Sequence, residues 1–317
     1  LLNTDREGNY ILTEDKMNFL LALFSILWKK PGESLSKEEE SIISEWLTLY
    51  YKQVNQYKRE RPRLDRFVSF IETISKSPSF TTDVRQKYFD AESFSLVLQK
   101  FCTDGTYGKT LNSEDNINIS EYSLICFDLF GVQSDPILYP VVSLIIIELV
   151  LDKMRKNPKT RKQMVIDEAW SMLSGSMGNF IEGLFRTLRK YNAGVSIISQ
   201  GIVELRNSPV GEAIKANAAT LILLDHNSQP ALIPDVQRFF GLTNHEVELF
   251  KSIRKTDTWR ELFIKRGNVS QVFAIDVGQH ATAAFSSLST DKAKIAELTK
   301  KGGPEYAINQ FVEDLNL

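Results

Sequence analysis

The sequence predicts an α/β fold: a mostly parallel sheet flanked by helices, with an all-helical subdomain and an antiparallel hairpin at the edge of the sheet. Three observations support this prediction. The first hundred residues show only helical periodicity, strand-like and helical segments alternate from about residue 106, and Gly267-Asn268 separates two apolar runs. The alternation indicates parallel βαβ units, and the glycine-asparagine turn indicates the antiparallel edge.

The composition is that of a globular protein with a substantial core. The chain has 317 residues, of which 43% are hydrophobic and 25% charged. Its net charge of −2 provides no global attraction to DNA or to anionic membranes. Cys102 and Cys126 have neither disulfide-framework nor metal-ligand spacing, so we expect two buried thiols in a reducing cytoplasm. His226, His245 and His280 form no zinc pattern.

Two apolar runs have to be considered as membrane spans. Residues 18–28 are too few, and residues 136–151 contain Glu148 and two prolines. Crossing a bilayer takes about 20 predominantly apolar residues. We therefore expect both runs to be buried helices, with any membrane association arising through partners or through sequence outside this chain.

Helices are expected throughout the subdomain that we assign to residues 11–104. Apolar residues recur at helical spacing in four segments, which are residues 14–30, 37–54, 63–75 and 83–101. Thr13 and Ser36 are predicted N-caps, and Pro31-Gly32 should separate the first two helices.

Residues 105–317 are assigned to the sheet-containing domain. The expected strands are residues 122–130, 164–168, 193–200, 219–225, 259–267 and 269–277. Between them we expect a long helix over 136–156, a second helix ending near Tyr191, and two amphipathic helices after residue 225. The C-terminal tail should form two helices broken at Gly302-Gly303-Pro304.

The segment MVIDEAW, residues 164–170, is the most informative for chemistry. An apolar strand ends there in two acids, at the carboxyl end where open parallel sheets bind ligands. Asp167 is suited to a water-mediated contact with Mg²⁺, and Glu168 to the general base that polarises an attacking water. The structural alternative is a strand followed by an acidic helix N-terminus, which the helix dipole favours.

Polar and basic residues near the following strand extend this pattern. Gln200 ends that strand, where an amide could sense a γ-phosphate and orient water, or could simply cap a helix. Arg186, Arg189 and Lys190 share one helix face and could stabilise phosphoryl transfer in a neighbouring subunit. A solvated basic face is the alternative. Arg189 is the preferred finger because it begins the turn into the strand.

GTYGKT, residues 105–110, superficially resembles a phosphate loop. In the motif G-x-x-x-x-G-K-[ST] the first glycine would fall on Thr103, and the segment follows a predicted helix instead of a strand. Lys109 is therefore interpreted as a loop lysine. The sequence contains no other Gly-Lys-Ser or Gly-Lys-Thr.

Together these segments resemble the C-terminal motor of conjugative-transfer and type IV secretion ATPases of the TraG/TraC kind, within the FtsK/HerA-like superfamily. The most specific similarity lies in four segments, which are residues 122–131, 164–170, 185–200 and 208–226. Residues 240–253, 259–267 and 284–295 also follow the family pattern, so the resemblance covers essentially the whole chain.

The resemblance implies a RecA-like sheet into which the helical subdomain is inserted. It implies ATP and Mg²⁺ as cofactors in the full-length protein, with Asp167 and Glu168 as the Walker-B pair. Gln200 matches the strand-end glutamine, and Arg189 with Lys190 matches the basic pair. The implied partners are copies of the chain in a hexamer, other apparatus proteins at the cytoplasmic face of the inner membrane, and DNA.

This sequence departs from the family because it contains no phosphate loop. We expect a fragment that lacks the first core strand and the phosphate loop and is hydrolytically inactive by itself. Two alternatives remain: a scaffold of the same apparatus with a degenerate nucleotide site, and a DNA-binding helical module centred on residues 57–67. The intact acid pair and Gln200 argue against the scaffold. In the module, Lys58, Arg59, Arg61, Arg63 and Arg66 would contact phosphates, although Glu60 and Asp65 dilute that charge.

Overall fold

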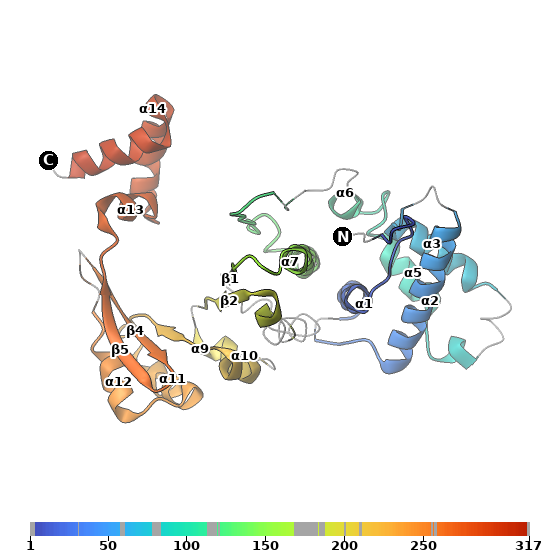
Figure 1. Ribbon diagram of the computed structural model, residues 1–317, viewed down its shortest axis with the longest axis horizontal. Helices are drawn as coiled ribbons and strands as arrows, with labels where there is room; N and C mark the ends of the chain where they lie inside the picture. Colours follow the sequence, from blue (N-terminus) through green and yellow to red (C-terminus); the bar gives the residue numbers. More distant parts are fainter. Residues whose placement is uncertain are drawn as a thin grey trace. The chain divides into compact units, whose positions relative to one another are not determined.

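The chain comprises two compact units, Leu1–Asn217 and Ala218–Leu317 (Figure 1). The computed structural model describes residues 4–30, 32–57, 61–77, 84–112, 119, 121–167, 183, 188–199, 201–208, 211–254, 256 and 259–315. It is a mixed α/β structure that is mostly helical, and the five strands of the described residues form two small sheets.

The regular elements described in the first hundred residues are all helices, as the periodicity predicts. They are α1 (Glu14–Trp28), α2 (Lys37–Gln56), α3 (Leu64–Ile74), the 3-10 helix η1 (Val84–Lys87) and α5 (Ala91–Gln99). Both predicted N-caps are confirmed. The hydroxyl of Thr13 accepts a hydrogen bond from the amide of Lys16, and Ser36 forms a reciprocal capping box with Glu39.

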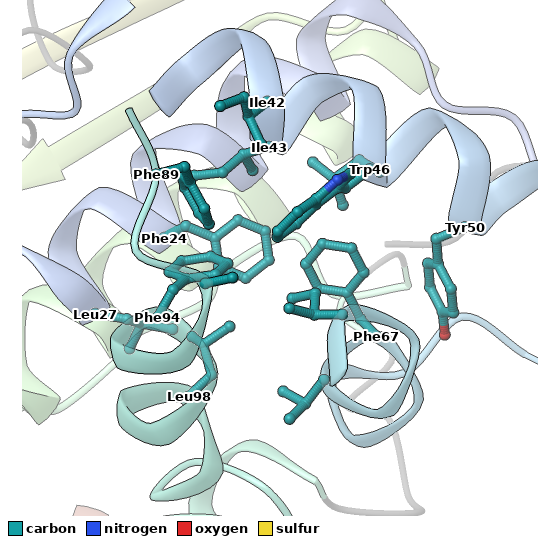
Figure 2. Packing of buried hydrophobic residues seen from close by; sticks show 14 of the residues in the cluster. Phe24, Leu27, Ile42, Ile43, Trp46, Tyr50, Phe67, Phe89, Phe94 and Leu98 are labelled. Atoms are coloured by element: carbon teal, nitrogen blue, oxygen red, sulfur yellow. The ribbon is translucent and has the colours of Figure 1, made fainter. Parts of the chain in front are cut away.

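An aromatic cluster holds these helices together (Figure 2). The ring of Phe94 on α5 lies 5.6 Å from that of Phe24 on α1 and 5.3 Å from that of Phe89, measured between centroids. Trp46 of α2 meets Phe89 edge to face at 5.0 Å. Because Phe94 and Trp46 are almost wholly buried, their burial stabilises the packing of α1, α2 and α5.

The GTYGKT segment is a compact turn after α5 that ends in the short helix α6 (Gly108–Leu111). The amides of Gly105, Tyr107 and Gly108 donate to backbone carbonyls, at 2.8, 2.8 and 3.0 Å. These amides are therefore engaged within the turn and cannot form the cradle that a phosphate loop offers. A Cβ on Gly105 would lie 2.3 Å from the carbonyl oxygen of Gln99, so close backbone packing explains this glycine.

The predicted strand over residues 122–130 is absent, and this correction also concerns Cys126. The segment is irregular, and Leu124 and Phe130 are 89% and 82% exposed. A β-prone sequence becomes a strand only where another strand pairs with it, and no described strand pairs with this segment. Cys126 is consequently exposed rather than buried, whereas Cys102 is half-buried and burial raises the pKa of its thiol to about 12.

The long helix α7 (Leu138–Lys156) contacts α1 through a partly buried group of charges. Arg155 forms two hydrogen bonds to the buried carboxylate of Glu148, at 3.1 and 3.3 Å, and its Nε lies 3.4 Å from Asp15. Burial lowers the pKa of the nearby Lys16 to about 8, although Glu148 and Asp152 act in the opposite direction. Within the described residues, no helix is both long and apolar enough to cross a membrane.

The first sheet consists of β1 (Lys162–Ile166) and β2 (Ala193–Ile197), paired in parallel. Between them lies η3 (Leu188–Tyr191), and after β2 come α9 (Ile202–Asn207) and α10 (Gly211–Asn217). The helix expected between Asp167 and Tyr191 falls largely outside the described residues.

The second sheet is entirely antiparallel, with the order β3-β4-β5. Its strands are β3 (Leu221–Leu223), β4 (Arg260–Arg266) and β5 (Val269–Ile275). The predicted hairpin is confirmed, and Gly267 adopts the left-handed conformation that its turn requires, with φ of 58°. The expected parallel pairing of residues 219–225 is corrected, because β3 runs antiparallel to β4. Strand direction depends on the partner, which local sequence does not specify.

Glu246 joins the helices of the second unit to this sheet. The helices are η4 (Pro230–Leu232), α11 (Ile233–Phe240) and α12 (Asn244–Lys251). The buried carboxylate of Glu246 on α12 accepts hydrogen bonds from Thr243, from Lys265 of β4 at 2.9 Å and from Ser270 of β5. Burial acts to raise the pKa of Glu246, but the hydrogen bonds from Ser270, Thr243 and Lys265 outweigh it and lower the pKa to about 2.

Two further helices end the described chain, α13 (Gly278–Ala284) and α14 (Ser289–Leu315). They share a small core that includes Ala283, Ala307 and Phe311. Gly303 interrupts α14 with φ of 85° and ψ of 175°, which confirms the predicted break at Gly302-Gly303-Pro304.

We expect Gly105→Ala to destabilise the first unit by about 1–3 kcal/mol, because the new methyl group would overlap backbone atoms. Urea unfolding measures this loss. Gly131→Ala is the matched control, since a Cβ there meets nothing within 4 Å, and its effect should stay within about 0.5 kcal/mol. Equal stability of the two variants would contradict the packing role of Gly105.

Glu246→Gln should cost about 1–3 kcal/mol at pH 7, because an amide cannot replace a carboxylate that accepts from several donors. The depressed pKa means that the stabilisation is present above the ordinary value of 4.5 and is lost as the pH falls towards about 2. Urea unfolding at pH 7 and at pH 3 should therefore show a smaller difference between wild type and variant at pH 3.

The control for that experiment is Glu248→Gln on the same helix, whose side chain is 72% exposed. It should leave stability nearly unchanged at both pH values. An equal loss in the two variants, or a Glu246→Gln effect that does not shrink in acid, would show that the carboxylate of Glu246 is not the stabilising group.

Candidate functional site

The parallel pairing of β1 with β2 fixes the geometry of the candidate site. The register aligns Lys162 with Ala193 and Ile166 with Ile197, without a bulge. One more hydrogen bond, from the amide of Ile198 to the carbonyl of Ile166 at 2.9 Å, continues the pairing past the last aligned residues. Both strands therefore end at the same edge of the sheet, where parallel sheets bind ligands.

Asp167 follows β1 directly at this carboxyl edge and is exposed. The side chains of Gln163 and Val165 alternate with buried or half-buried ones along β1, so Asp167 continues the exposed face. Ser199 follows β2 at the same edge, and its hydroxyl donates to the carbonyl of Gly201 at 2.9 Å. The predicted site residues Glu168 and Gln200 are the next residues along the two strands, and both lie outside the described residues.

Lys190 and the backbone of Arg189 belong to the opposite edge of the sheet. Lys190 is exposed on η3, which precedes β2. The backbone of Arg189 lies in the same turn, whereas its side chain and the whole of Arg186 fall outside the described part of the chain. A strand of five residues, such as β1, spans about 16 Å. The turn and Asp167 are thus separated by the length of the sheet, and one chain does not bring them together.

This separation determines the chemistry available at each edge. At the carboxyl edge, an exposed carboxylate could take part in holding Mg²⁺ through water. At the amino edge, the exposed Lys190 places a positive charge at the end of the sheet opposite Asp167. No group of three or more His, Cys, Asp and Glu side chains suited to a metal ion occurs within the described residues.

Sequence reasoning missed the residues that hold the basic turn in place. The ammonium group of Lys162 donates to the carbonyl of Tyr191 at 2.8 Å, and Asn192 adopts a left-handed backbone conformation with φ of 54°. A signal for Asn192 was available, because asparagine is the common non-glycine residue in that conformation. For Lys162 there was none, since its partner is 29 residues away.

Two of the three described arginines in the basic cluster of residues 57–67 are engaged locally. Arg63 pairs with Asp65 at 3.3 Å, and the guanidinium of Arg66 donates to the carbonyl of Arg61 at 3.2 Å. Lys58 and Arg59 lie outside the described residues. Asp65 also accepts from the amide and hydroxyl of Thr103, at 2.9 and 2.6 Å, which ties this region to the turn after α5.

Comparison with solved structures relates this fold to VirB4 of Thermoanaerobacter pseudethanolicus. The similarity covers 83% of this chain and 69% of that chain, with a TM-score of 0.61 and 16% sequence identity. At that identity the comparison shows the shared fold.

Comparison with curated proteins gives two relatives. Protein TraC of Escherichia coli (strain K12) is 25% identical over 260 residues, which cover 77% of this chain and 29% of TraC. Type IV secretion system protein CagE of Helicobacter pylori (strain ATCC 700392 / 26695) is 28% identical over 136 residues, which cover 43% of this chain and 13% of CagE. The chain thus spans less than a third of the length of either relative.

The family comparison covers nearly the whole chain, because the description "TraG P-loop domain" matches residues 6–315. Structural similarity to VirB4 and sequence similarity to TraC and CagE agree with this match. The chain belongs to the TraG P-loop domain family.

Proposed function

We propose that this chain is the part of a type IV secretion or conjugation ATPase that contributes the acidic edge of the nucleotide site. One observation carries the proposal: β1 and β2 are parallel neighbours, and an exposed Asp167 stands where β1 ends. Membership of the TraG P-loop domain family supports a nucleotide as the ligand of this edge.

We assign a different role at this edge to each of Asp167, Glu168 and Gln200. Asp167 contacts Mg²⁺ through water, Glu168 accepts a proton from the attacking water, and Gln200 orients that water against the γ-phosphate. ATP and Mg²⁺ are the cofactors. Because the sequence has no phosphate-loop motif, we expect this chain alone to bind ATP weakly and not to hydrolyse it.

Arg189, with Lys190 and Arg186 near it, acts on the nucleotide of a neighbouring subunit. The distance between the two edges of the sheet supports this assignment, since about 16 Å of strand separates the turn from Asp167 of its own chain. The proposal requires a ring in which each carboxyl edge meets the basic turn of the next copy, and a hexamer is the ring that we propose. We propose that this ring acts together with other proteins of the secretion apparatus at the inner membrane, and with DNA.

We expect Glu168→Gln to abolish ATP hydrolysis while ATP binding persists, because the amide keeps the size of the side chain but cannot accept the proton. The experiment compares turnover with the affinity for a fluorescent ATP analogue. It uses a form of the protein that includes a phosphate loop.

Glu212→Gln provides the matched control. Glu212 is an exposed acid on α10 whose side chain pairs with Lys215, and losing that surface ion pair should leave both quantities unchanged. Retained turnover in Glu168→Gln would rule out Glu168 as the general base, and loss of binding together with turnover would indicate a structural role.

A further inference from the structure

We propose that Lys162 and Asn192 are positioning residues that hold the basic turn, residues 188–191, in a fixed orientation for a neighbouring subunit. The inference rests on the proposed function for its effect on catalysis, but the anchoring can be tested without it. It concerns the amino edge of the sheet, opposite the edge at which Asp167 follows β1.

Lys162 holds the end of the turn through two hydrogen bonds, one from its side chain and one from its backbone. Its side-chain Nζ donates to the carbonyl of Tyr191 at 2.8 Å, and its backbone amide donates to the carbonyl of Asn192 at 3.1 Å. The side chain is half-buried. A hydrogen bond from a charged donor at a partly buried site is stronger than one between neutral groups.

Asn192 closes the turn from the other side. Its backbone is left-handed, with φ of 54°, and this reverses the chain so that η3 can lead into β2. Its side-chain amide donates to the carbonyl of Lys159 at 3.3 Å. The turn is therefore connected to the segment before β1 as well as to β1 itself.

Leu188 anchors the start of the turn, since it is 2% exposed, whereas Lys190 is exposed between the anchors. A buried leucine on one side and two hydrogen-bonded residues on the other leave little freedom to the backbone that carries Arg189 and Lys190. A cation that stabilises a transition state is effective when its position is set in advance, because no ordering cost then accompanies the reaction.

The anchoring is tested first on this chain alone, by hydrogen exchange of the amides of residues 188–193. Lys162→Met should accelerate their exchange about tenfold or more, because a charge-assisted hydrogen bond is lost. Lys162→Arg keeps a donor and should restore slow exchange. The amide of Ile198, bonded to the carbonyl of Ile166, serves as the reference for the sheet and should keep its protection in both variants.

Lys156→Met is the matched control for this substitution. Lys156 is 58% exposed and pairs with Asp152 one helical turn away, so its loss should not alter exchange in the turn. Unchanged exchange in Lys162→Met would overturn the anchoring. Faster exchange that extends to Ile198 would overturn it as well, since the substitution would then act on the sheet as a whole.

The catalytic consequence is tested in assembled protein that includes a phosphate loop. Lys162→Met should lower kcat as far as Arg189→Ala does, with little change in KM for ATP, and the double variant should be no slower than Arg189→Ala alone. Lys162→Arg should recover kcat. Losses that multiply in the double variant would overturn the positioning role.

These outcomes separate the inference from the proposed function. If Arg189→Ala left turnover unchanged, the trans role proposed for Arg189 would fail, and Lys162 could not be positioning it for catalysis. The exchange experiment would then still decide whether Lys162 holds the turn.

Discussion

The parallel pairing of β1 with β2 is the constraint on which the functional interpretation depends. Parallel strands bring like ends together, so the register that aligns Ile166 with Ile197 places the residues after both strands at one edge. The same register places the residues before both strands at the other edge. A single pairing therefore separates Asp167 from the basic turn, and the proposed site would combine them through contact between copies.

The helical subdomain is joined to this sheet through α7, which leads into β1. Glu148 is buried on α7, and the cost of burying its charge is offset by the two hydrogen bonds from Arg155. Arg155 also contacts Asp15 on α1. Lys153 of the same helix donates to the carbonyls of Ile119 and Tyr122. One helix thus connects the aromatic core of the subdomain to the start of β1.

Local signals were sufficient to predict much of the fold. Thr13 and Ser36 cap helices because their hydroxyls accept from amides a few residues away, and the turn at Gly267 and the break at Gly303 depend on backbone conformations that glycine adopts without strain. Residues 122–130 were mispredicted as a strand, and β3 was predicted as a strand but with the wrong pairing direction, because pairing is decided by distant partners. Cys126 was wrongly expected to be buried because it lies in the segment 122–130, which is irregular and mostly exposed.

The candidate site was predictable in outline and not in detail. The sequence alone was enough to place Asp167 at the end of a strand. Its position near the end of β2 could be expected because the carboxyl ends of parallel strands meet at one edge of the sheet. The roles of Glu168, Gln200, Arg186 and Arg189 stay predictions, because these side chains lie outside the described residues. The link between Lys162 and Tyr191 spans 29 residues, so no local pattern could have predicted it.

The central claim is that the acidic edge of one copy and the basic turn of another form one catalytic site. Mixing Glu168→Gln, which should be inactive, with Arg189→Ala, which should be slow, in assemblies that include a phosphate loop tests it most directly. An Arg189→Ala copy keeps Glu168 and can receive Arg189 from a Glu168→Gln neighbour, so the mixture should turn over ATP faster than either variant alone. A mixture no faster than its components would contradict the claim.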